Sequence, residues 1–250
     1  MLRPWSSIPI VECCESLESV PSSLLRISPH PYQSLNAPYG KNMNPWRLRI
    51  GLINRLLIAQ NNLKILNPSF QLGLYDALRP LTVQLFMFNH EIDVMCEAKG
   101  FKRNDPNRTS ELNNIVNQVS KFWAPPISDP MTPPPHSTGA AVDLTLYNLE
   151  GLEVDLGSKI DFIGSISSPN YFAQEGRKND EARDFHQKRS ILKKVMLKAG
   201  FVQHPNEWWH FSFGDQLWAW KTKKKNAIYG SWEVLSEIND KTSLSPNLLI

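Results

Sequence analysis

Apolar residues recur at helical spacing along much of the chain. Over residues 48–66, Leu52, Leu56, Leu57, Leu63 and Leu66 recur at helical spacing, and Pro68 stands just beyond them. A similar stretch follows Pro80 and ends at Gly100, a residue type that is common after helix C-termini. The pattern predicts helices over residues 48–66, 81–99, 109–122 and 181–199, the last of them basic and amphipathic.

Between these helices, short stretches have the alternation that is typical of half-buried strands. The alternation predicts strands over residues 70–75, 141–147, 152–156, 201–202 and 208–213, with a turn at 148–151. Helices and strands are interspersed, but the strand patterns favour hairpins over parallel crossovers. We therefore expect an α+β fold with a central antiparallel sheet flanked by helices.

The chain divides into three parts of different composition. Residues 1–46 hold seven prolines and few periodic apolar positions, which predicts an N-terminal arm packed on a domain. Residues 47–220 are expected to form that domain, and residues 221–250 a C-terminal tail. Within the domain, residues 125–135 contain six prolines. So many fixed φ angles predict a stiff extended loop, which we interpret as shaping a site because it leads into the most informative segment.

Composition excludes several classes of protein. The 250 residues are 41% hydrophobic and 20% charged, as expected of a folded globular protein, and a net charge of +3 does not favour nucleic-acid binding. No apolar run approaches the roughly 20 residues that span a bilayer. The first thirty residues show no secretory signal pattern, so we expect a cytoplasmic protein. Three cysteines make a disulfide framework improbable.

Two segments, 135–143 and 207–211, carry the residues suited to chemistry. His136, Asp143 and His210 offer two neutral nitrogen donors and one carboxylate, a set that suits Zn²⁺. A catalytic zinc keeps three protein ligands and a water, and this ligand set leaves it a net positive charge. That charge lowers the pKa of the bound water.

Strand geometry places a carboxylate beside that water. If residues 208–213 form a strand, Trp209 and Phe211 share the face directed at the core, and His210 faces an opening. Glu207 lies at the start of the strand and could reach the water held by His210. There it would act as a general base toward water and then as an acid toward the leaving amine.

Each of these residues also has an ordinary structural explanation. A loop histidine such as His136 is more often a surface or hydrogen-bonded residue than a ligand, and the Trp208-Trp209 pair is typical of a core. Asp143 could be an ordinary carboxylate at the end of a strand. From the residues alone, a metal hydrolase and a purely structural role remain open alternatives.

Over about residues 45–220, the chain resembles the zinc D-Ala-D-Ala peptidases, and within them the D-alanyl-D-alanine dipeptidase branch of the VanX type. The resemblance rests on Pro135-His136-Ser137-Thr138-Gly139-Ala140-Ala141-Val142-Asp143-Leu144-Thr145-Leu146 and on Glu207-Trp208-Trp209-His210. It implies a Hedgehog/DD-peptidase-like zinc peptidase fold, with residues 47–220 as the zinc D,D-dipeptidase catalytic domain. It further implies one zinc per chain on His136, Asp143 and His210, with Glu207 as the catalytic base.

The resemblance adds two further residues and shows one departure. Arg79 matches the arginine of the family's Asp-x-x-Arg-Pro pattern, which stabilises the oxyanion of the tetrahedral intermediate. Asp161 matches the aspartate that receives the substrate's ammonium. A carboxylate in that role rejects N-acylated peptides, which leave it unpaired. Family members commonly carry Ser where this chain has Pro134, which puts recognition of the substrate's C-terminal part in doubt.

These observations define three hypotheses. The first is a zinc metallopeptidase that hydrolyses free D-Ala-D-Ala, or a similar small D,D-dipeptide, in the cytoplasm without a nucleic-acid or membrane partner. The second is a zinc D,D-carboxypeptidase or endopeptidase acting on peptidoglycan stem peptides, which the missing secretory pattern disfavours. The third is a zinc-stabilised binding module without turnover. The sequence leaves the oligomeric state open.

Overall fold

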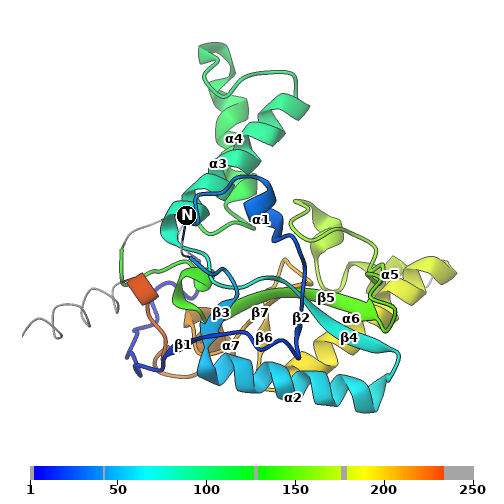
Figure 1. The fold of residues 1–250 in the computed structure, drawn as a ribbon. Coiled ribbons are helices and arrows are strands. Elements are labelled where there is room, and N and C mark those ends of the chain that lie inside the picture. The colour runs from blue at the N-terminus through cyan, green and yellow to red at the C-terminus, as the bar shows by residue number, and fades with distance from the viewer. Residues whose placement is uncertain (1–2, 42, 127–128, 176–178, 234–250) are drawn as a thin grey trace, which may run out of the picture.

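A computed structural model describes residues 3–41, 43–126, 129–175 and 179–233, and Figure 1 shows its fold. In chain order, its elements are β1 (Leu17–Ser19), β2 (Leu25–Arg26), α1 (Pro31–Ser34), β3 (Arg47–Arg49), α2 (Ile50–Leu66), β4 (Phe70–Asp76), α3 (Leu81–Ala98), η1 (Pro106–Arg108), α4 (Thr109–Val119), η2 (Pro135–Thr138), β5 (Ala141–Asn148), η3 (Ser165–Ser167), α5 (Tyr171–Glu175), α6 (Asp180–Lys198), β6 (Val202–Gln203), β7 (His210–Ser212) and α7 (Gln216–Lys221). Of the predicted tail, residues 234–250 lie outside the described part of the chain, as do residues 127–128 of the proline-rich loop.

The central sheet has the strand order β2-β4-β5-β7-β6. The pairs β4–β5, β5–β7 and β6–β7 are antiparallel, whereas β2 pairs with β4 in parallel. The predicted α+β architecture with flanking helices is confirmed, and the sheet is mixed because the arm contributes the edge strand β2. A second, two-stranded sheet pairs β1 of the arm with β3.

One face of the central sheet carries the main hydrophobic core. Helices α2 and α6 pack against this face (Figure 1). Leucines such as Leu56 and Leu192 are fully buried there. Val142 and Leu144 of β5 point into the same core, so the intervening Asp143 points to the other face. The alternation along β5 therefore separates the core from the face that carries the polar residues.

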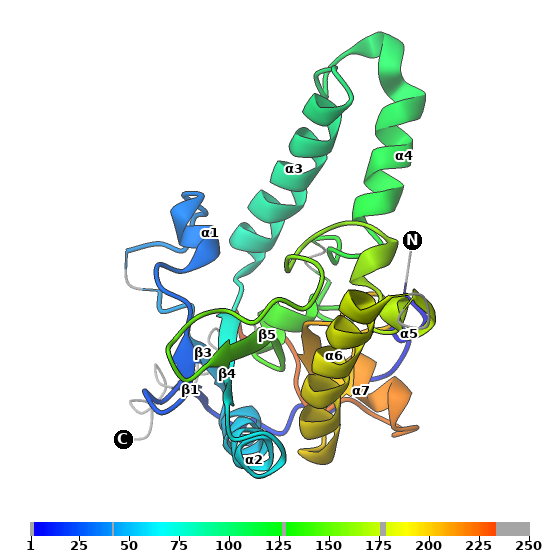
Figure 2. The ribbon, with the colours of Figure 1, turned by 90° about the vertical axis from the view of Figure 1, so that its right-hand side faces the viewer.

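Helices α3 and α4 form a hairpin that projects from the sheet (Figure 2). It has a hydrophobic cluster of its own, in which Met87 and Ile92 of α3 meet Ile115 and Val119 of α4. Trp123, just beyond α4, belongs to the same cluster and lies at the base of the hairpin. The hairpin thus ends beside the polar face of the sheet.

The long helices form where the apolar spacing predicts them, and two strand predictions are too long. Over 152–156 only Glu153 bridges to Tyr147. There the Asp155 carboxylate accepts a hydrogen bond from the backbone N–H of Gly157, and Gly157 has φ +83°, so the chain turns away from the sheet. The strand predicted over 208–213 is confined to β7. In the described residues, no helix combines the length and apolar character needed to cross a bilayer.

Candidate metal centre and active site

Two of the three predicted metal ligands face each other across adjacent strands. In the antiparallel register of β5 and β7, Asp143 is the partner of His210 and Val142 is the partner of Phe211. Cross-strand partners point to the same face of a sheet, with Cβ atoms roughly 5 Å apart. Pairing of β5 with β7 therefore brings the carboxylate and the imidazole together on the polar face.

The third ligand comes from the short helix η2, which leads into β5. Gly139 ends this helix with φ +67°, and a Cβ atom there would clash with the side chain of Leu17. The buried Arg49 fixes the turn, since its Nε donates to Thr138 O (2.9 Å) and its backbone N–H to Gly139 O (3.0 Å). This turn, which the left-handed backbone of a glycine permits, directs His136 back toward Asp143.

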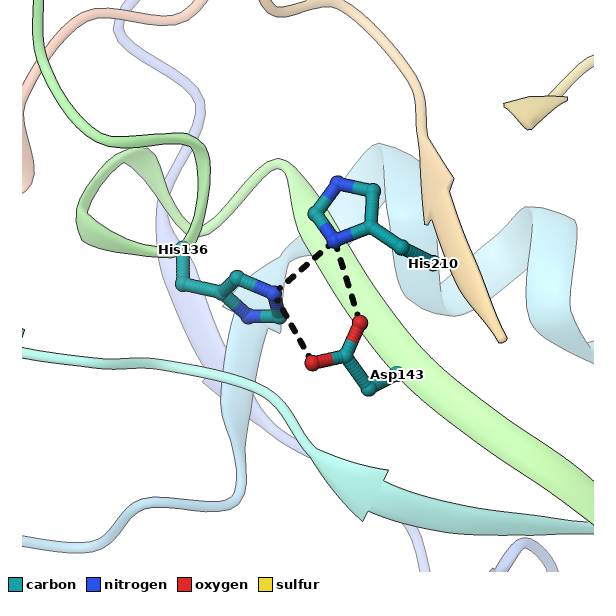
Figure 3. Close-up of side chains that lie close together, drawn as sticks. All are labelled: His136, Asp143 and His210. Atoms are coloured by element: carbon teal, nitrogen blue, oxygen red, sulfur yellow. Dashed lines mark hydrogen bonds and ion pairs between the residues drawn. The ribbon is translucent and has the colours of Figure 1, made fainter. Parts of the chain in front are cut away.

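Figure 3 shows the resulting cluster of His136, Asp143 and His210. One ligand atom from each residue lies within 4.8 Å of the other two, and all three residues are buried. Asp143 Oδ2 is 3.2 Å from His136 Nε2, and Asp143 Oδ1 is 3.0 Å from His210 Nδ1. The two imidazole nitrogens are 3.2 Å apart. The three residues thus present their donor atoms to one shared point.

The surroundings of the two imidazoles suit a metal ion at that point. His136 Nδ1 donates to the carbonyl of Ala77 (2.8 Å), and in this tautomer of the neutral imidazole Nε2, which faces the cluster, is the nitrogen that can bind a metal. His210 Nε2 lies 3.1 Å from Ser212 Oγ. Such contacts to the far ring nitrogen orient metal-binding histidines. Asp143 Oδ1 is buried, and its contact among the described residues is with His210 Nδ1 (3.0 Å), itself a ligand atom of the cluster. Two neutral imidazoles and a carboxylate oxygen with spare coordination capacity fit Zn²⁺.

Glu207 lies at the edge of this cluster, as its position before β7 predicts. Its Oε2 is 3.7 Å from His210 Nδ1, and its Oε1 is 3.3 Å from His204 Nδ1. Burial, together with the nearby charge of Asp143, raises the pKa of Glu207 to about 8, although Arg3 acts in the opposite direction. A cation at the cluster would lower this pKa, because it stabilises the carboxylate.

Arg79 is held in place by polar contacts on several sides. Its Nε donates to Asp76 Oδ2 (3.0 Å), Nη1 to Gln84 Oε1 (2.9 Å) and Nη2 to the hydroxyl of Tyr32 (3.1 Å). Nη2 also lies 3.5 Å from Asp143 Oδ2. Burial by itself would lower the pKa of the Arg79 guanidinium. The neighbouring Asp76 carboxylate has the larger effect and holds this pKa well above its usual value. The cation is therefore fixed beside the cluster.

Asp161 reaches the same cavity from the loop after β5. It adopts a left-handed backbone with φ +67°, which aspartate tolerates better than most residues, and accepts a hydrogen bond from Tyr32 Oη (3.0 Å). Burial and the charge of Asp143 raise the pKa of Asp161 well above its usual value. One cavity is lined by all six predicted site residues, namely Arg79, His136, Asp143, Asp161, Glu207 and His210.

The structure adds residues to which the sequence interpretation assigned no role. Asp76 and His204 each lie three positions before a predicted site residue, and that spacing was the available signal. His30 donates to Asp76 Oδ1 (3.2 Å). Burial would raise the pKa of Asp76, but Arg79, followed by His30 and His136, lowers it to about 2. Tyr32 bridges Arg79 and Asp161. His30 and Tyr32 belong to the arm, where the sequence shows no motif.

Comparison with known proteins places this site in a family. Residues 28–228 match the model of the peptidase M15 family, described as D-Ala-D-Ala dipeptidase. A D-alanyl-D-alanine dipeptidase of Synechocystis sp. is 38% identical over 243 residues, which cover 93% of this chain and 98% of that protein. A D-alanyl-D-alanine dipeptidase of Enterococcus faecalis is 39% identical over 82 residues, or 32% of this chain and 37% of its own length.

Among solved structures, a mutant of VanY in complex with Zn(II) is similar at a TM-score of 0.45 and 12% sequence identity. This VanY is a D,D-pentapeptidase from a VanB-type vancomycin resistance cassette, and the similarity covers 83% of each chain. The family model and the Synechocystis relative both span most of this chain. The chain therefore belongs to the M15 metallopeptidases, in the D-Ala-D-Ala dipeptidase family.

Proposed function

We propose that the protein hydrolyses free D-alanyl-D-alanine to two molecules of D-alanine, with one zinc ion held by His136, Asp143 and His210. The observation that carries this proposal is the single cavity in which that triad meets Glu207, Arg79 and Asp161. The names of the relatives support the choice of substrate. The three ligands also support a catalytic site over a structural one, because structural zinc sites usually use four protein ligands.

Glu207 has the position and the environment of a general base. When bound, zinc would supply a Lewis acid that polarises the peptide carbonyl and makes water a better nucleophile. Glu207 takes a proton from the attacking water as its oxygen bonds to the carbonyl carbon. The same carboxyl then gives this proton to the nitrogen as the C–N bond breaks, releasing the second D-alanine as an amine.

Arg79 is suited to stabilise the oxyanion that forms on the carbonyl oxygen. A donor aimed at developing charge is effective when it is fixed beforehand, because no reorganisation is then needed during the reaction. Asp76, Gln84 and Tyr32 fix the guanidinium in this way. Asp76 also balances part of its charge within the buried site.

Asp161 is suited to bind the substrate's ammonium group. Its raised pKa means that burial disfavours the carboxylate in the free protein. An ammonium beside it would supply the missing counter-charge and favour ionisation. An N-acylated peptide cannot do so and would leave a buried polar group unpaired. This residue would therefore restrict the enzyme to free dipeptides.

The test is amine release from D-Ala-D-Ala by the purified protein, with and without a chelator and with zinc restored. We expect release that the chelator abolishes and zinc recovers. An N-acetylated peptide ending in D-Ala-D-Ala, assayed in parallel, should not be cleaved. Equal cleavage of the acetylated peptide would favour the D,D-carboxypeptidase or endopeptidase alternative. No cleavage of either substrate by folded, zinc-loaded protein would overturn the proposal.

A further inference from the structure

The N-terminal arm brings a second arginine to the cavity. The side chain of Arg3 lines it together with Glu207, His204 and Trp123, and Arg3 Nη2 donates to Phe122 O (2.9 Å). Arg3 is partly buried, and its Cζ lies 5.7 Å from the ring centroid of Trp5. A cation thus enters the cavity from a segment that contains none of the family's motif residues.

The arm that carries Arg3 is anchored on both sides. The buried Trp5 packs edge-on against His204, with ring centroids 5.7 Å apart, in a small cluster with Val202 and Leu217. Gln216 Nε2 lies 2.7 Å from the carbonyl of Ile8 and 3.2 Å from that of Ser6. The position of Arg3 is therefore set by packing and hydrogen bonds on its own segment.

Unlike Arg79, Arg3 has no carboxylate partner in the part of the chain that the structure describes. Its guanidinium carries five N–H donors, yet the described residues receive a hydrogen bond only at Phe122 O and form no ion pair with it. Burial lowers the pKa of Arg3, while the more distant charges of Glu207 and Asp215 act against this effect. Such a cation is poised to bind an anion, since a partner would offset its cost of desolvation.

Arg3 and Asp161 approach the cavity through different neighbours. Asp161 accepts a hydrogen bond from Tyr32, which also contacts Arg79. Arg3 donates to the carbonyl of Phe122, and the nearby Trp5 packs on His204, whose Nδ1 lies 3.3 Å from Glu207 Oε1. These contacts place Arg3 on the Glu207 side of the cavity. In the proposed reaction, the ammonium lies at Asp161 and the leaving D-alanine lies on the side of Glu207, which protonates it. The carboxylate of the leaving D-alanine is therefore directed toward the end that Arg3 occupies.

We propose that Arg3 binds the C-terminal carboxylate of the dipeptide and is a specificity-determining residue of the site. This inference rests on the proposed dipeptidase function. A planar guanidinium with free N–H groups matches a carboxylate in a bidentate arrangement. Arg3 also lines a neighbouring small cavity with Pro134 and Pro135, next to the position where the serine common in the family is absent. Arg3 of the arm thus supplies a charged hydrogen-bond donor close to Pro134, which has no hydroxyl group.

The experiment compares D-Ala-D-Ala with its C-terminal amide in the wild-type zinc enzyme and in Arg3→Met, which keeps an unbranched apolar side chain but no charge. The wild type should prefer the free acid. In Arg3→Met, kcat/KM for the acid should fall by about 10- to 100-fold, mostly through KM, as for loss of a hydrogen bond to a charged group. The value for the amide should stay within about twofold, so the preference for the acid should disappear.

Gln216→Ala is the companion variant, because it loosens the arm without removing a charge from the cavity. It should reduce the preference for the acid by less than Arg3→Met does, since the guanidinium is still present. An equal loss toward both substrates in Arg3→Met would overturn the inference. It would show that Arg3 acts by holding the arm in place or by its electrostatic effect on Glu207. In that case wild-type cleavage of D-Ala-D-Ala would still stand. No cleavage of either substrate by the wild type would overturn the function and the inference together.

Discussion

The cavity has two walls that are built in different ways. The sheet wall consists of β5, β7 and η2. Asp143 and His210 lie on strands that are paired on both sides, and His136 lies on the short helix that leads into β5. The arm wall belongs to the N-terminal arm, whose described residues 3–41 contain β1, β2 and the single-turn helix α1 as their regular elements. The arm contributes Arg3 to the lining of the cavity, and its Tyr32 supports the lining residues Arg79 and Asp161 by hydrogen bonds.

The difference between the walls suggests that one wall serves metal binding and the other serves substrate recognition. Groups that hold a metal must keep a fixed geometry, and a sheet interior supplies it. Groups that choose a substrate can come from irregular segments, which tolerate more sequence change. We expect damage to the sheet wall to remove the chemistry, and damage to the arm wall to alter recognition while chemistry remains.

The largest effect should follow from loss of a sheet-wall ligand. We expect His210→Ala to reduce zinc from one ion per chain to none, measured by elemental analysis, and activity to the chelator-treated background. His90→Ala is the control, because His90 lies on the projecting helix α3 and stacks on Phe86. Full zinc content and turnover in His210→Ala would contradict the assignment of the triad.

The next largest effect should come from the proton-transfer residue. Glu207→Gln keeps the size of the side chain but cannot accept the proton from water, so kcat should fall by at least about 100-fold. Zinc content should stay at one per chain, since Glu207 is not among the three residues of the triad. A variant with near wild-type kcat would exclude Glu207 as the general base.

A smaller effect is expected where the arm wall supports the sheet wall. Tyr32→Phe removes the hydroxyl that contacts both Arg79 and Asp161, and should lower kcat/KM for D-Ala-D-Ala by about 10-fold, or roughly 1.4 kcal/mol. Tyr39→Phe is a matched control, since its hydroxyl makes only a long 3.4 Å contact to Asp76. Equal losses in the two variants would show that the bridge made by Tyr32 has no special role.

The smallest effect concerns stability. The pKa of Asp161 is higher in the folded protein than the unfolded value of about 3.9, so ionising it costs stability as the pH rises above about 4. Asn avoids this cost and tolerates the left-handed backbone. We expect metal-free Asp161→Asn to be more stable than metal-free wild type by roughly 1 kcal/mol at pH 7, or about 2–4 °C in Tm.

This advantage should vanish below about pH 4, where the wild-type carboxyl is protonated in both states. Thermal melts of the two proteins across this pH range provide the measurement. The same variant should lose dipeptide turnover, because an amide offers no charge to the ammonium. An Asp161→Asn variant less stable than wild type at pH 7 would show that burial of the ionised Asp161 carboxylate does not destabilise the folded protein.

The directions of the side chains on the sheet wall could be predicted from local rules, whereas the choice of His136, Asp143 and His210 as one ligand set came from the resemblance to a known family. Asp143 and His210 lie on strands whose alternation fixes their direction, and Gly139 marks the turn that returns His136. The long helices could also be predicted, since the helical spacing of their apolar residues extends over several turns.

The arm wall could not be predicted in this way. Strand β2 has two residues and α1 has four, too few for a period to be recognised. Tyr32 reaches Asp161 across 129 residues and Arg3 reaches Phe122 across 119 residues. Only the tertiary fold reveals such contacts, because no spacing in the sequence encodes them.

The pairing of Asp143 with His210 across β5 and β7 has a consequence for folding. Side chains along a strand alternate between faces, so a slip of one residue would turn one of the two ligands into the core and leave the other alone. A chain misaligned at this ladder has no complete set of donors. An ion bound by the triad would therefore stabilise the correctly aligned ladder over the slipped one, because only the aligned ladder offers the full set of donors.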